Sequence, residues 1–181
     1  MNKIILIFLG TSLFLASCKK EPIPTYLTIN FTHTVNGSDL ITNNMIYTNE
    51  AGEDYDVQTL KYLISNITLH DDLGSTILKD IHFIDISDES TFSFTYNDVP
   101  NNNYTSISFD MGLDPAKNIS AKYVNEGMGT NQYFHATMFW PETNGGGYHY
   151  MKLEGDFNDS LSGYGTHTGG TMGSDYSFNN V

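Results

Sequence analysis

Apolar and polar side chains alternate along residues 26–35. The apolar parity holds Leu27, Ile29, Phe31, His33 and Val35. A period of two is the spacing of a strand with one buried face. The Asn36-Gly37 pair that follows is a strong turn signal. The pattern therefore predicts a half-buried β-strand that ends in a tight turn.

Further segments are rich in β-branched and aromatic residues and are separated by turn-forming residues. They are residues 62–70, 76–84, 91–96, 104–109, 133–140 and 148–156. One short helix is expected over residues 114–124, where Asp114 can cap the helix and Pro115 can take its first position. Many short strands at such spacing are typical of two packed antiparallel sheets. We predict an all-β fold, an antiparallel β-sandwich with at most one or two short helices.

The N-terminal residues have the pattern of a targeting segment. Within residues 1–17, Lys3 precedes an apolar stretch that is too short to span a bilayer of roughly 30 Å. The stretch ends in Leu15-Ala16-Ser17-Cys18, which resembles a bacterial lipobox and implies that Cys18 is acylated and becomes the mature N-terminus. Residues 18–25 then form a tether, and residues 26–181 a single domain. The Gly- and Ser-rich end leaves open whether that domain is shortened.

A lipid on Cys18 predicts a protein of the cell envelope, held at the outer membrane on its periplasmic or surface-facing side. Each buried acyl CH₂ contributes about 0.8 kcal/mol to such an anchor. The chain has 21 acidic and 8 basic residues, a formal net charge of −13, and none of the basic residues is an arginine. Nucleic acid is therefore not an expected partner, because phosphate binding needs clustered cations. We expect contact with the membrane through the lipid alone.

The composition also limits the chemistry. Hydrophobic residues make up 39% of the chain, with 12 Tyr and 11 Phe, which is enough for a packed core. The single cysteine excludes an internal disulfide and a cysteine-based zinc site. We find no nucleophile elbow and no phosphate-binding glycine loop. The expectation is a protein that is not an enzyme.

No two of the six histidines have the spacing of a local metal motif, so a metal site would need ligands from different strands. His33 lies on the apolar parity of its strand, where an imidazole needs either a metal or a hydrogen-bond partner. His167 lies in a glycine-rich segment that permits close backbone approach. His149 shares its parity with Met151. By contrast, His82 is interpreted as an edge or turn residue.

Histidine and methionine together suit copper. Met138 precedes the Phe139-Trp140 pair, and Met151 follows a glycine-rich turn. The other interpretation is that these methionines and aromatic residues fill the core between two sheets. The residues alone leave both interpretations open.

Several blocks, in order, resemble the MbnP-like proteins, a family of copper-binding proteins associated with methanobactin gene clusters. The blocks are Phe31-Thr32-His33-Thr34-Val35-Asn36-Gly37, then residues 60–67, then residues 104–114, then Met138-Phe139-Trp140 with Gly147-Tyr148 and Met151-Lys152-Leu153-Glu154-Gly155, and finally His167-Thr168-Gly169. The resemblance covers nearly the whole mature chain. It implies an all-β fold and copper binding outside the cytoplasm. Related copper proteins use histidines together with a tryptophan oxidised to kynurenine.

The resemblance implies one copper ion as the cofactor or cargo, with His33 and His167 as ligands. His149, Met151 and His135 are the reserve ligands, and Trp140 is either modified or packed beside the ligands. The function expected is a copper-binding lipoprotein that sequesters, buffers or delivers copper without turnover, with a metal-delivery or redox partner of unknown identity. The alternative is a metal-free structural or glycan- or partner-binding β-sandwich lipoprotein, in which Tyr148 and Tyr150 would contact the ligand.

Overall fold

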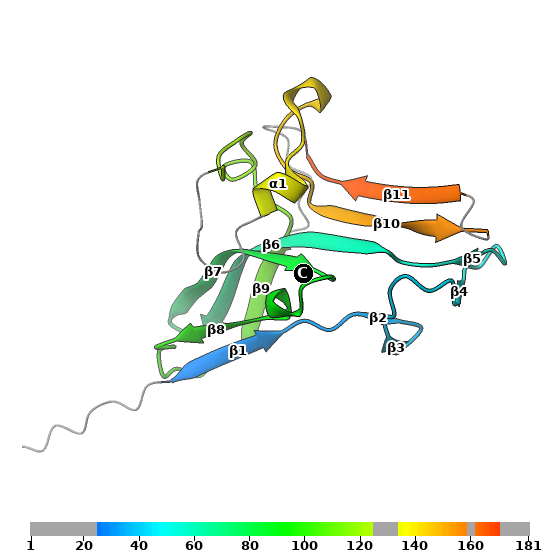
Figure 1. Ribbon diagram of the computed structural model, residues 1–181. Coiled ribbons are helices and arrows are strands. Elements are labelled where there is room, and N and C mark those ends of the chain that lie inside the picture. The colour runs from blue at the N-terminus through cyan, green and yellow to red at the C-terminus, as the bar shows by residue number, and fades with distance from the viewer. Residues whose placement is uncertain (1–24, 125–133, 159–161, 171–181) are drawn as a thin grey trace, which may run out of the picture.

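A long strand, β6 (Thr59–Asp71), is the centre of the fold in the computed structural model, which describes residues 25–124, 134–158 and 162–170 (Figure 1). Its hairpin partner is β7 (Gly74–Asp85), and Asp71 closes the turn by accepting hydrogen bonds from the backbone of Leu73 and Gly74. The predicted signal peptide, Cys18 and residues 171–181 lie outside the described residues.

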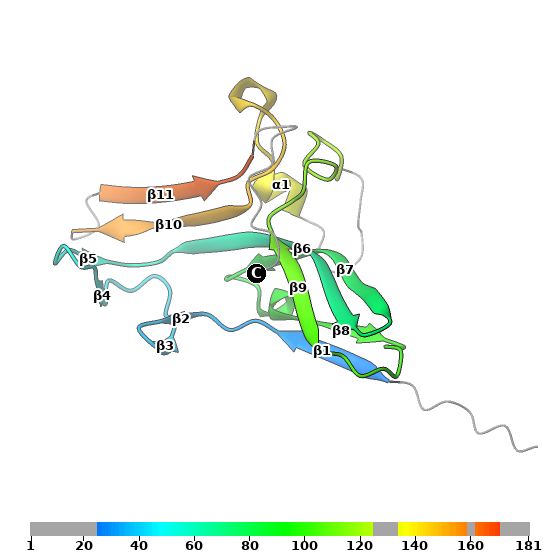
Figure 2. The ribbon, with the colours of Figure 1, turned by 180° about the vertical axis from the view of Figure 1, so that it is seen from behind.

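The edge of β6 that faces away from β7 is shared by two strands. The first half of β6 pairs with β10 (Met151–Phe157), and the second half pairs with β9 (Ser106–Met111). The register of β6 shifts beyond Ser65, where Asn66 adopts a positive φ of 55°. Such a bulge bends the strand. β9 and β10 therefore diverge from β6 in different directions (Figure 2).

Shorter elements extend this sheet. β11 (Ser162–Thr168) pairs with β10, and β5 (Asp54–Tyr55) joins β10 to β4 (Tyr47–Thr48). The remaining short elements are β2 (Thr34–Val35), β3 (Ser38–Asp39), and the 3-10 turns η1 (Glu89–Phe92) and η2 (Glu142–Asn144). The predicted turn at Asn36-Gly37 joins β2 to β3, with positive φ at both residues. Across the described ranges, no helix is long and apolar enough to cross a membrane.

A second layer covers one face of the large sheet. β1 (Tyr26–Asn30) pairs with β8 (Ser93–Asn97) in antiparallel register. Leu27, Ile29 and Phe31 pack toward β6 and β7, against a buried cluster that includes Ile64, Ile67 and Ile84. The apolar side chains of residues 26–35 therefore lie on the inward face, as their alternation predicts. The antiparallel β-sandwich is confirmed.

The opposite face of the large sheet carries a second core, and here one predicted strand is wrong. Residues 134–138 form α1 (Phe134–Met138), not part of a strand over 133–140. Phe134 and Met138 are both buried with Leu63 and Tyr148. Residues four apart share one face of a helix, so a helix can bury both side chains in the same core.

One further expectation fails for local reasons, and another holds only in part. Residues 114–124 form turns instead of a helix, because Ala121 has a φ of 57° and the Asn118 side chain binds distant backbone groups, at Tyr148 and Gly170. His82 does lie on β7, an edge strand of the large sheet, but its side chain is fully buried. Its Nε2 hydrogen-bonds to the Thr91 carbonyl (2.8 Å), and the ring stacks on Phe31. Burial lowers the pKa of His82 to about 4.

Candidate metal centre

Three aromatic side chains are in contact beside the open end of the β10–β11 hairpin. We call Trp140, His149 and His167 the His–Trp cluster. The Trp140 and His149 ring centroids lie 4.1 Å apart, and those of His149 and His167 lie 4.8 Å apart in an edge-on arrangement. His149 is buried, whereas the His167 side chain is about one-third exposed. The cluster therefore leads from the interior to the solvent.

Backbone pairing places Trp140 and His149 side by side. The Trp140 N–H donates to the Gly147 carbonyl (2.9 Å), and the His149 N–H donates to the Met138 carbonyl (2.7 Å). Gly147 turns the chain between them with a φ of 85°. The segment that follows α1 thus folds back on itself as a small hairpin.

Gly169 brings the end of β11 against the same segment. A methyl group on Gly169 would lie 2.8 Å from the Tyr148 carbonyl oxygen and 3.2 Å from the His149 Cα. Contacts this close exclude a side chain. Gly169, two residues after His167, therefore permits the close backbone approach that the sequence predicts.

A carboxylate orients the exposed imidazole. His167 Nε2 lies 2.6 Å from Glu154 Oε1, and Lys152 Nζ lies 3.8 Å from the same oxygen. The three residues share one sheet face because Lys152 is directly opposite His167 in the register. Hydrogen bonding to His167 and the charge of Lys152 outweigh burial and lower the pKa of Glu154. The sequence does not reveal the role of Glu154, because that role depends on the strand register.

Two polar atoms of the cluster are buried and unsatisfied. Within the described part of the chain, neither His149 Nδ1 nor Trp140 Nε1 has a hydrogen-bond partner. Burial, followed by the nearby His167 and Lys152, lowers the pKa of His149 to about 4. The imidazole is therefore neutral at physiological pH, the form that ligates metals. A neutral imidazole with an unpaired nitrogen can coordinate a metal ion through that nitrogen.

The structure does not bring the predicted ligands His33 and His167 together. His33 Nε2 lies 2.9 Å from the Tyr62 hydroxyl, and burial lowers the pKa of His33. Tyr62 pairs with Met151, whereas His167 pairs with Lys152, the next residue along β10. Neighbouring residues of a strand point to opposite faces. The two histidines therefore lie on opposite faces of the large sheet, and a hydrogen bond satisfies His33.

The reserve ligands are also divided. His149 contacts His167 on one face of the sheet, whereas Met151 projects from the other face. Strand β10 begins only at Met151, so the alternation of side chains along β10 does not extend back to His149. His135 lies on α1, where its Nδ1 is 2.9 Å from the Tyr148 hydroxyl. In the described ranges, no three or more His, Cys, Asp or Glu side chains converge on a common metal position. Of the residues predicted, His149, His167 and Trp140 come together.

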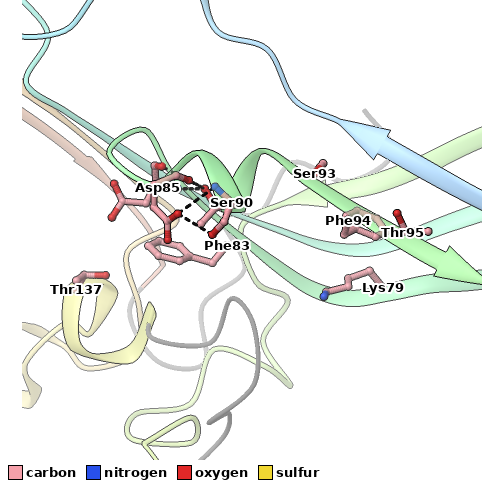
Figure 3. Close-up of a pocket in the computed structure, with 10 residues that line it drawn as sticks. Lys79, Phe83, Asp85, Ser90, Ser93, Phe94, Thr95 and Thr137 are labelled. Atoms are coloured by element: carbon pink, nitrogen blue, oxygen red, sulfur yellow. Dashed lines mark hydrogen bonds between the residues drawn. The ribbon is translucent and has the colours of Figure 1, made fainter.

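Two further observations limit other kinds of site. Tyr148 and Tyr150, the aromatic pair expected to bind a glycan, are 0% and 3% exposed and belong to the core. A cavity of about 510 Å³ lies between β7, η1 and β8, with Thr137 of α1 at its border (Figure 3). Lys79 points into it, with its Nζ 5.5 Å from the centre of the Phe94 ring. Of the described residues that line this cavity, none is a histidine and none belongs to the His–Trp cluster.

The fold and the site together define a class: an all-β sandwich protein with a histidine–tryptophan cluster at one edge of its larger sheet. Residues 24–181 match the MbnP family, so the chain belongs to that family. A search of curated proteins and a search of solved structures each gave no match.

Proposed function

We propose that this protein is an extracytoplasmic copper-binding lipoprotein that sequesters, buffers or delivers copper and performs no turnover. Membership of the MbnP family supports a copper-related role. The observation that carries the proposal is the contact between the imidazoles of His149 and His167, beside a tryptophan ring. Imidazole is a ligand that suits copper, and a site with vacant nitrogens binds copper more tightly than the neighbouring divalent metals.

His149 and His167 are the ligands that we assign to the ion, in place of the pair His33 and His167. The vacant Nδ1 of His149 supports this assignment. Glu154 holds Nε2 of His167, so Nδ1 is the nitrogen of His167 that we assign to the metal. A carboxylate behind a metal-binding histidine fixes its tautomer and orientation. The Trp140 ring packs against the His149 ring and adds to its burial.

A copper titration tests the proposal. Purified protein is titrated with Cu(II) in competition with a chromogenic chelator. We expect one equivalent to bind, and His149→Ala and His167→Ala to weaken binding on the order of 100-fold or more, since even second-shell changes cost about 10–100-fold. His33→Ala is the matched control, because its imidazole has a protein partner on the other sheet face.

The outcomes separate the function from the site. A folded parent protein that binds no copper contradicts the function and favours a metal-free β-sandwich lipoprotein. Copper binding that both cluster variants retain contradicts the assignment of His149 and His167 but leaves the function standing. Circular dichroism of each variant shows whether its fold is intact.

A further inference from the structure

A second site lies at the far end of the β10–β11 hairpin from His167, where β4 and β5 join the sheet (Figure 1). A cavity of about 440 Å³ opens there. It is lined by Asn49, Glu53, Tyr55, Leu153, Phe157 and Tyr164. We call Tyr55, Phe157 and Tyr164 the aromatic cage. These side chains are partly exposed, so their ring surfaces are accessible to a ligand.

The walls of the cage stand at a steep angle to each other. The rings of Tyr55 and Tyr164 have centroids 6.4 Å apart and an interplanar angle of 78°. Phe157 is directly opposite Tyr55 in the strand register, and both therefore lie on one face. A sugar ring stacks on a flat aromatic platform. Walls at right angles instead enclose a compact, rounded group.

Each tyrosine wall is held in place by the fold. The Tyr164 hydroxyl donates to the Asp56 carbonyl (2.6 Å), and its ring lies over Gly155, where a side chain would collide with it. Tyr55 packs against Tyr47, with ring centroids 5.5 Å apart. A preorganised site of this kind loses little entropy when it binds a ligand.

The charge at the cage is negative. Among the described residues that line the cavity, Glu53 is the charged one. Asn49 fixes the turn that carries it, because Asn49 Oδ1 accepts the Glu53 N–H (3.0 Å) and Asn49 Nδ2 donates to Glu53 Oε2 (3.1 Å). The protein as a whole has a formal net charge of −13. Both the local and the overall field therefore attract a cation.

We propose that the aromatic cage and Glu53 bind a small organic cation that carries a compact alkylated ammonium group. The negative faces of aromatic rings attract such a cation within about 6 Å of the ring centre, and aromatic cages recognise quaternary ammonium groups in this way. Glu53 adds an attraction that a neutral ligand of the same shape would lack. The site is independent of copper, because it lies on the other sheet face and shares no residue with the His–Trp cluster.

Choline and its neutral isostere neohexanol, in which carbon replaces the nitrogen, are the probes. The full chain in detergent is titrated with each and followed by NMR through the aromatic signals of Tyr55, Phe157 and Tyr164. We expect saturable shifts with choline and none with neohexanol at equal concentration. Equal binding of neohexanol, binding of a methyl glucoside in place of choline, or no binding of choline would each overturn the proposal.

Two variants locate the site. Tyr55→Leu should weaken choline binding roughly tenfold, the loss of one desolvated cation–π contact. Glu53→Gln keeps the shape and removes the charge, and it should weaken choline binding several-fold with the fold unchanged. Glu50→Gln is the matched control, because Glu50 is exposed on the same turn and does not line the cavity. A Glu53→Gln variant that binds choline as tightly as Glu50→Gln contradicts the role of Glu53 and with it the proposal.

Discussion

The imidazole of His167 stands edge-on to that of His149, with ring centroids 4.8 Å apart, while its Nε2 rests 2.6 Å from the carboxylate of Glu154. The partly exposed ring is therefore held by two separate contacts. Such an arrangement fixes the orientation of His167 before any metal arrives. Its consequences can be measured one residue at a time.

Glu154→Gln tests the orientation of His167. The amide keeps the volume of the side chain but loses the negative charge that favours one imidazole tautomer. We expect copper affinity to fall by about 10–100-fold, the usual effect of a second-shell change. Competition with a chelator measures the loss. Glu142→Gln, in the exposed η2 turn, is the control and should bind as the parent does. Equal affinities for the two variants would argue against Glu154 as the residue that positions His167.

Substitutions of Trp140 distinguish a role in packing from a role in copper binding. The ring is half-buried and lies outside both core clusters. Replacing a core tryptophan by alanine lowers the free energy of unfolding by about 3–5 kcal/mol. We expect Trp140→Ala to lower it by less, as measured by chemical denaturation. Trp140→Phe should retain stability and weaken copper binding, since the smaller ring covers His149 less. A Trp140→Phe protein with unchanged copper affinity would make the indole purely structural. Mass spectrometry of the natively expressed protein tests oxidation of Trp140 to kynurenine, which would appear as a small gain in mass.

His82 makes stability depend on pH. Its pKa is about 4 in the folded protein and 6.5 as the reference value. Above pH 6.5 the residue is neutral in both states, and the stability is fully present. Between pH 6.5 and 4 the unfolded state binds the proton first, so the free energy of unfolding falls by about 3 kcal/mol as pH falls through this window.

Urea denaturation at several pH values measures this dependence. His82→Gln retains a donor for the Thr91 carbonyl but cannot titrate, so its stability should fall less over the same range. His149, whose pKa is also about 4, adds to the dependence, as do His33 and Glu154, whose pKa values are lowered in the folded protein. A parallel pH dependence of the parent and the His82→Gln protein would contradict the assignment of the effect to His82.

The lipid anchor rests on the sequence Leu15-Ala16-Ser17-Cys18. We expect Cys18→Ser to prevent acylation and to move the protein from the membrane to the soluble fraction, because the lipid is the proposed attachment. Ser17→Ala, which keeps a small residue before the cysteine, should remain in the membrane fraction. Fractionation and the intact mass of the protein measure both. A Cys18→Ser protein that stays in the membrane fraction would disprove the anchor.

The sequence alone determined the fold class, because alternation of apolar residues is a local property. Residues 26–35 show this directly: each apolar position predicted to face inward does so, and the Asn36-Gly37 turn forms where its backbone preferences require. The strand predicted over residues 133–140 is wrong because Phe134 and Met138 can share one face of a helix as well as one face of a strand. Only packing against Leu63 and Tyr148 selected the helix.

Only the tertiary structure decided which histidines meet. The sequence identified His149, His167 and Trp140 as candidates, but it ranked His33 above His149 because His33 lies on an apolar parity. The His33 imidazole hydrogen-bonds to the Tyr62 hydroxyl, on the opposite face of the sheet from His167. The partners of His167 follow from the register that sets Lys152 opposite it, and a shift of one residue would turn the ring to the other face. Register arises from pairing between distant segments, so no local pattern could specify it.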